Sequence, residues 1–211
     1  MTNVQVCISI SIVLASIFGT FFFVNIHRHD EMFIPGVNPK DVYRVFSNFT
    51  NFFILEPNLI RFKLLAILDG EKIINVTEEV KYNEFKVPDQ KVALKNSQDW
   101  GYIVWYEEFY QYLPSIFTNK NEGKYILSQA VNQEDAFIFS SYHSTEFLPG
   151  HPISTTCINT FKEVVRNEVT GTLFTESLSY ESPILFLAIA NAEVEYQRPK
   201  VFKALHNWRY N

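Results

Sequence analysis

The feature that most constrains the fold of this chain is the order of its apolar patterns: a series of strand-like segments is followed by one long helical segment. The strand-like segments are rich in β-branched and aromatic residues and are separated by turn-forming clusters such as Asp69-Gly70. Consecutive strands with short links pair as an antiparallel meander, because a parallel crossover needs a longer connection, usually a helix. Strands are expected at 60–68, 72–85, 102–112, 124–131, 136–147, 155–164 and 172–180.

Helical spacing is predicted on either side of this series. Asn38 is a typical N-cap and Pro39 suits the first helical position, so a short helix begins there, after a short first strand at 32–35. Residues 183–208 follow helical spacing to the end of the domain, and Pro199 is expected to kink that helix. The predicted fold class is therefore α+β, with a curved antiparallel sheet around a long C-terminal helix.

The N-terminal run from residue 4 to residue 26 contains no charged side chain. At about 1.5 Å per residue it is long enough to cross a hydrocarbon core of roughly 30 Å. No basic residue precedes it and it ends in Phe21–Val24, which disfavours the alternative of a cleaved signal peptide. We therefore predict a transmembrane anchor at residues 1–30 and a folded domain at residues 31–211.

The charges and sequons that flank the run give the expected location of the domain. Arg28 and further basic residues follow the run, so the positive-inside rule places the folded domain of a single-pass membrane protein in the cytoplasm. A lumenal or secreted domain is the alternative, and glycosylation sequons at Asn48 and Asn75 would fit it. Cys157 is the single cysteine of the folded part, which favours a reducing compartment.

Composition narrows the class of ligand. Aromatic residues make up 16% of the chain, including 20 Phe and 11 Tyr, more than an ordinary core of this size needs. This excess indicates either a large internal cavity or a surface that meets apolar material. The net charge is −5 without a dense Lys/Arg cluster, so nucleic-acid binding is not expected.

Two motifs resemble the START-like superfamily (SRPBCC, helix-grip fold), in particular its polyketide-cyclase and coenzyme-Q-binding branches. They are Asn38-Pro39-x-x-Val42-Tyr43-x-Val45-Phe46 and Gly171-Thr172-x-x-Thr175-Glu176-x-Leu178-x-Tyr180-x-x-Pro183. The resemblance covers the whole folded part, although residues 69–123 form a longer and more polar stretch than the family pattern. It implies a sheet that grips the C-terminal helix around an apolar cavity for lipids, sterols, isoprenoid quinones or polyketides. A collapsed core without a cavity is the alternative.

Strand alternation and helical spacing select the candidate ligand-binding residues. In the last strand the face of Phe174, Glu176 and Leu178 should point inward, and a carboxylate there needs a partner. Trp105 and Phe109 share one face of their strand and Tyr106 and Tyr110 the other, so either pair could line a cavity. The candidates are Trp105, Phe109, Phe139, His143, Phe174, Glu176 and Leu178 on strands, and Leu185, Ala188 and Ala192 on an inner helical stripe.

Motifs for catalysis, metals and phosphate are missing from the sequence, including HExxH, CxxC and a Gly-rich phosphate loop. No metal or cofactor is therefore expected. The predicted function is non-catalytic binding or transfer of a lipid or other apolar small molecule by a domain tethered through residues 4–26. The alternative is a cyclase-like or hydratase-like enzyme with Glu176 and His143 as acid and base. These two side chains could instead simply satisfy each other or the nearby backbone.

Overall fold

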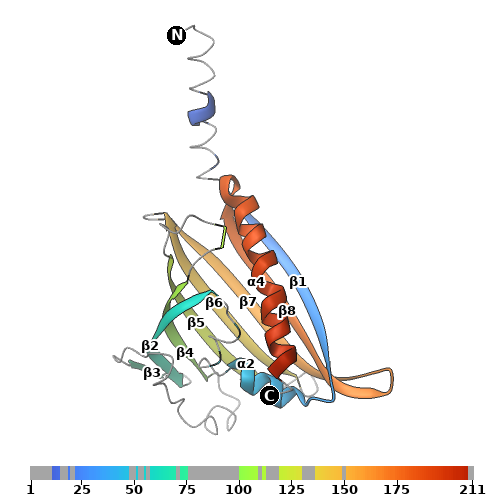
Figure 1. Cartoon of the computed structure of the whole chain (residues 1–211). Helices are drawn as coiled ribbons and strands as arrows, with labels where there is room; N and C mark the ends of the chain where they lie inside the picture. The colour runs from blue at the N-terminus through green and yellow to red at the C-terminus, as the bar shows by residue number, and fades with distance from the viewer. Residues whose placement is uncertain are drawn as a thin grey trace.

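The computed structural model describes residues 11–14, 19, 22–47, 51, 55, 58–69, 72–75, 100–108, 111–112, 119–129, 136–148 and 151–208. Within these ranges the chain forms one sheet and a long C-terminal helix that lies across its concave side (Figure 1). The eight described strands pair antiparallel in the order β1-β8-β7-β6-β5-β4-β2-β3. The predicted α+β arrangement of a curved sheet around a closing helix is confirmed.

The strand order follows the chain from β4 to β8, whereas β1 pairs with β8 and β2 lies between β4 and β3. The strands are β1 (Phe23–Pro35), β2 (Leu59–Asp69), β3 (Lys72–Asn75), β4 (Trp100–Glu108), β5 (Asn119–Gln129), β6 (Phe137–Leu148), β7 (His151–Arg166) and β8 (Val169–Pro183). Strands β4 to β8 form the predicted meander, while β1 pairs with the last strand, β8. The part of the predicted strand 72–85 beyond residue 75 lies outside the described residues.

Strand β1 corrects the prediction for the N-terminal run. It is 13 residues long rather than a short strand at 32–35, and residues 23–30, predicted to belong to the anchor, pair with β8. Its backbone groups find partners along the whole of β8, which favours a strand over a helix there. The sheet therefore includes residues 23–30 as well as the predicted strand at 32–35. Within the described ranges, no helix has the length and apolar character needed to cross a membrane, and most of the predicted anchor lies outside those ranges.

The pairing of β1 with β8 also explains one glycine. A side chain at Gly171 would collide with the carbonyl oxygen of Ile34, and its Cβ would lie 2.9 Å from the ring of Phe33. Only a residue without a Cβ allows the end of β1 to approach β8 this closely.

The predicted short helix is confirmed as α2 (Pro39–Ser47). The Asn38 side chain accepts a hydrogen bond of 2.8 Å from the Lys40 backbone N–H, as expected of an N-cap. Val42 and Phe46 on its inner face are buried, and the Phe46 ring lies 5.3 Å from that of Phe174 on β8. This helix and the sheet together form the aromatic part of the core.

The C-terminal helix α4 (Leu187–Trp208) follows a single 3₁₀ turn, η2 (Ile184–Phe186), and continues through Pro199 without a break. Val201 and Leu205 in its second half are fully buried in the core beside α2. The inner face of its first half includes small and polar residues such as Ala190 and Glu193. The core is therefore solid at one end of the helix and open at the other.

The predicted inner stripe of this helix was wrong. Each helical residue turns the chain by about 100°, so the nine positions from Ala192 to Val201 place these two residues on opposite faces. Val201 is buried against the sheet, so the opposite face of the helix is the outer one. Ala188 is exposed on this face, and Leu185, just before the helix, is half-exposed. The prediction was wrong because the inner faces before and after Pro199 were assigned separately. In one continuous helix the position of the first face fixes the position of the second.

Candidate functional site

A cavity of about 200 Å³ lies between the sheet and the first half of α4. Apolar side chains from both layers line it, among them Val104, Phe139, Leu178, Ile189, Ala190 and Val194. An apolar cavity of about 150 Å³ in a protein core is large enough to hold benzene. The core of this domain therefore has room for a small guest, and the alternative of a fully collapsed core was wrong.

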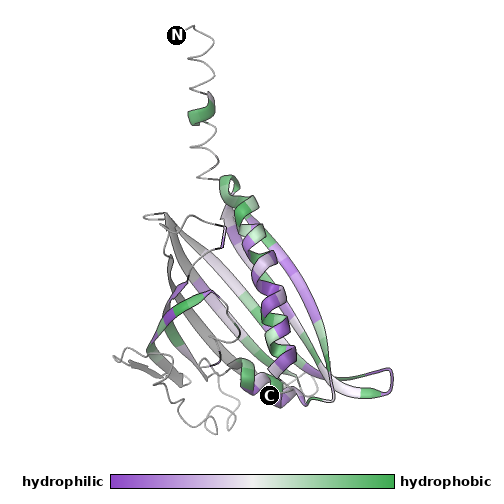
Figure 2. Ribbon diagram, viewed as in Figure 1, coloured by the Kyte–Doolittle hydropathy of each residue, from purple (hydrophilic) through white to green (hydrophobic). Residues whose placement is uncertain are grey.

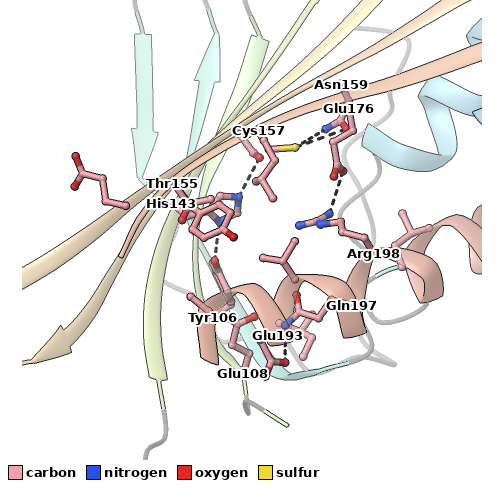
Figure 3. Close-up of a pocket in the computed structure, with 18 of the residues that line it drawn as sticks. Tyr106, Glu108, His143, Thr155, Cys157, Asn159, Glu176, Glu193, Gln197 and Arg198 are labelled. Atoms are coloured by element: carbon pink, nitrogen blue, oxygen red, sulfur yellow. Dashed lines mark hydrogen bonds and ion pairs between the residues drawn. The ribbon is translucent and has the colours of Figure 1, made fainter. Parts of the chain in front are cut away.

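A buried ion pair lies on one wall of the cavity. Arg198 on α4 contacts Glu176 on β8, with 3.0 Å between Nη1 and Oε2 (Figure 3). The Glu176 side chain is fully buried and that of Arg198 is 14% exposed. The second carboxylate oxygen of Glu176, Oε1, is buried and has no hydrogen-bond partner among the described residues. The cavity wall thus contains a buried hydrogen-bond acceptor without a donor among the described residues.

A second polar group lies across the cavity, on β4 and β6. The Tyr106 hydroxyl is 2.6 Å from Nδ1 of His143, and Nε2 of His143 is 3.0 Å from the Ser141 hydroxyl. Burial, and then the positive charge of Arg198, lowers the pKa of His143 from 6.5 to about 4. The imidazole is therefore neutral near pH 7, with one ring nitrogen that donates and one that accepts.

A second buried carboxylate, Glu193, lines the cavity from α4 and was not predicted from the sequence. It accepts hydrogen bonds of 2.7 Å from the Asn58 side chain, 3.1 Å from Gln197 and 3.3 Å from the Tyr112 backbone N–H. All of these donors are neutral. The only feature of the sequence that could have indicated this position is an acidic residue between Ala190 and Val194, on the face of the helix that lines the cavity.

The charges that line the cavity are mostly negative. Its walls hold the carboxylates of Glu108, Glu176 and Glu193, and the side chain of Arg198. Since His143 is neutral at pH 7, the formal balance of these groups is negative. In a buried site of low dielectric constant, such a balance disfavours an anionic guest. Within the described part of the chain, no group of three or more His, Cys, Asp and Glu side chains is placed to hold a metal ion.

The predicted inner faces of β6 and β8 are confirmed. Phe139, His143, Glu176 and Leu178 all line the cavity. Phe174 is on the same face of β8 and is fully buried, but it packs against Phe161 and Phe202 in the solid core instead of lining the cavity.

The other predicted site residues lie elsewhere. Tyr106 lines the cavity, and Trp105 consequently points to the other face of β4, where the Arg61 guanidinium lies 5.4 Å from its ring. Leu185, Ala188 and Ala192 are not among the lining residues, because the phase of the helix turns them away from the sheet. Phe109 is outside the described residues.

Comparison with known proteins gives likenesses of structure alone, since no family model and no curated protein matches the chain. Ara h 8.0201 has 10% identity and a TM-score of 0.46 over 88% of this chain and 97% of its own. A protein from Thermus thermophilus has 11% identity and a TM-score of 0.48 over 86% and 95%. Truncated norcoclaurine synthase from Thalictrum flavum has 10% identity and a TM-score of 0.45 over 88% and 94%. None of these likenesses assigns the chain a ligand or a reaction.

Proposed function

We propose that this protein binds a small apolar molecule that carries a hydrogen-bond donor, in the cavity between α4 and the sheet. The observation that supports this most is the lone Oε1 of Glu176, buried in the cavity wall without a described partner. A buried acceptor without a donor costs about 1–3 kcal/mol. A ligand O–H or N–H at that point would recover this free energy, and the apolar walls would take the rest of the molecule.

The size and charge of the site limit the ligand further. A volume of about 200 Å³ is below the roughly 300–1,000 Å³ of typical drug-sized pockets, so a molecule of one or two rings fits better than a sterol or a long-chain quinone. The negative lining argues against fatty acids and phosphates, whose head groups would face Glu176 and Glu193. The ligand is therefore a neutral or cationic compound.

Calorimetric titration of the full chain with three matched naphthalenes tests the proposal, with protein-free micelles as the blank. We expect 2-naphthol to bind and 2-methoxynaphthalene, which has no donor, to bind at least tenfold more weakly, since a hydrogen bond to a charged group contributes about 1.5–3 kcal/mol. The anion 2-naphthoate should bind weakest. Equal affinities for all three would contradict the proposed role of Glu176.

A pair of variants on one helix locates the binding. Ala190→Phe places a ring in the cavity and should abolish 2-naphthol binding, because Ala190 lines it. Ala188→Phe adds the same ring on the exposed face and should leave the affinity unchanged. Equal effects of the two variants would show that the ligand binds outside the cavity.

A second candidate function is proton transfer on a bound apolar substrate. His143 and Glu176 line the same cavity, although each contacts another residue in the structure. The lowered pKa keeps His143 unprotonated at neutral pH, so its imidazole can accept a proton, but it is a weaker base than one whose pKa lies near 7. A ketone such as 2-tetralone should then exchange its α-protons in D₂O faster with the protein than in buffer, and His143→Gln should remove the difference. Exchange at the buffer rate would contradict proton transfer, and binding would then be the one remaining proposal for the cavity.

We further propose that the charge-free residues before β1 tether the domain to a membrane. Residues 4–22 carry no charged side chain, and the described turn at residues 11–14 is helical and exposed. Exposed apolar helix of this kind is stable in lipid rather than in water. Flotation of the full chain with phosphatidylcholine vesicles after an alkaline wash tests the tether, and a glycosidase shift at Asn48 or Asn75 tests whether the domain is lumenal or cytoplasmic.

A further inference from the structure

We propose that the domain itself rests on the bilayer through an apolar rim made by Phe22, Phe23, Ile184 and Leu185. This rim lies at the end of the domain where β1 begins and α4 starts (Figure 1). The inference rests on the proposed membrane tether but not on the identity of the ligand in the cavity.

The rim is a single patch built from the start of β1 and the η2 turn that precedes α4. The Ile184 backbone N–H donates a 2.9 Å hydrogen bond to the Phe22 carbonyl, and Phe23 pairs with Pro183 at the end of the sheet. Its side chains are 49%, 38%, 50% and 50% exposed in the order Phe22, Phe23, Ile184 and Leu185. Single exposed apolar residues are ordinary on a protein surface, but a cluster of large ones marks a contact surface.

A lipid bilayer is the partner that these residues fit. The helical turn at residues 11–14 is coloured as hydrophobic and projects from the same end of the domain (Figure 2). Its large apolar side chains are 56–60% exposed. Gly19, between this turn and the rim, lies against Leu185, since a Cβ on Gly19 would be 3.4 Å from the Leu185 Cβ. The sequence that joins the turn, Gly19 and the rim carries no charged side chain. A surface of this kind is placed at the boundary of head groups and acyl chains.

The rim also leads directly to the cavity. Phe186, Ile189 and Ala190 follow Leu185 along the chain into α4 and line the cavity, and Ser182 lines it from the end of β8. An apolar ligand dissolved in the bilayer would consequently meet the cavity wall within one or two helical turns of the membrane surface. The docking of the rim thus supplies a route for the ligand that does not pass through bulk water.

Site-specific fluorescence of the full chain in phosphatidylcholine vesicles tests this docking. A bimane label at Leu185→Cys reports on the rim, in a Cys7→Ser background where the remaining Cys157 is buried. Val165→Cys is the matched control, because Val165 is an apolar residue that is 67% exposed near the β7–β8 turn, far from the rim (Figure 1). Lipids with a doxyl group at carbon 5 serve as the quencher.

We expect the label at position 185 to shift to the blue and to be quenched at least twofold more strongly than the label at position 165. Flotation without quenching at position 185 would overturn the docked rim while the tether remains. Failure of the protein to float would overturn both. A blue shift that grows with protein concentration and resists lipid quenching would assign the rim to a second copy of the chain and would also overturn the inference.

Discussion

Removal of Arg198 should destabilise the domain by several kcal/mol. In Arg198→Met the fully buried Glu176 loses its 3.0 Å contact with the guanidinium, and its other oxygen has no partner among the described residues. Breaking a buried pair by removing one member costs about 3–5 kcal/mol, because the remaining charge is left uncompensated. For a domain of this size such a loss lowers the Tm by roughly 6–20 °C.

Urea unfolding of the full chain in mild detergent measures this loss, and two further variants interpret it. Glu195→Gln breaks the pair of Glu195 with Arg28, in which the Glu195 side chain is 68% exposed, and should cost less than about 1 kcal/mol. Glu176→Leu combined with Arg198→Met replaces both charges by apolar groups and should regain most of the stability. If Arg198→Met costs no more than Glu195→Gln, the burial and coupling inferred for the ion pair are refuted.

Two further predictions concern His143 and Gly171. The pKa of His143 falls from 6.5 unfolded to about 4 folded, so the unfolded state binds the extra proton and the free energy of unfolding should drop by roughly 3 kcal/mol as pH falls from 6.5 to 4. His143→Phe should lack this part of the pH dependence in urea titrations, and an unchanged pH slope would contradict the buried neutral imidazole. Gly171→Ala should lower the free energy of unfolding by about 1–3 kcal/mol, because the added Cβ collides with β1. In Gly19→Ala the added Cβ has ordinary contact distances, so the Tm should not fall. Equal Tm values for the two alanine variants would argue against the close approach of β1 and β8.

The parts of the site that could be predicted are those where one face of an element is clearly apolar. On β8 the residues Phe174, Leu178 and Tyr180 share one face, and the small polar residues Thr175, Ser177 and Ser179 share the other, so the inward position of Glu176 followed from the pleat alone. The same alternation placed His143 correctly on β6. The sequence also indicated that a buried carboxylate would need a partner. It could not identify this partner as Arg198, because the contact depends on how α4 crosses the sheet, 22 positions further along the chain.

The parts that could not be predicted have patterns that are ambiguous in sequence. Strand β4 carries aromatic rings on both faces, so only the structure shows that Tyr106 points inward and Trp105 outward. The start of β1 was hidden within the charge-free run, since Val24 and Ile26 suit a lipid environment as well as a strand. Glu193 was missed because its partners, among them Asn58 and Gln197, come from distant parts of the chain or the next helical turn.

Nuclear Overhauser effects between bound 2-naphthol and methyl groups of the full chain test the central claim most directly. If the guest occupies the space between α4 and the sheet, its ring protons should contact the methyl groups of Leu178, Ala190 and Val194, which line the cavity from both sides. Contacts restricted to exposed methyl groups such as those of Ile184 and Ala188 would instead place the ligand on the surface and contradict the account.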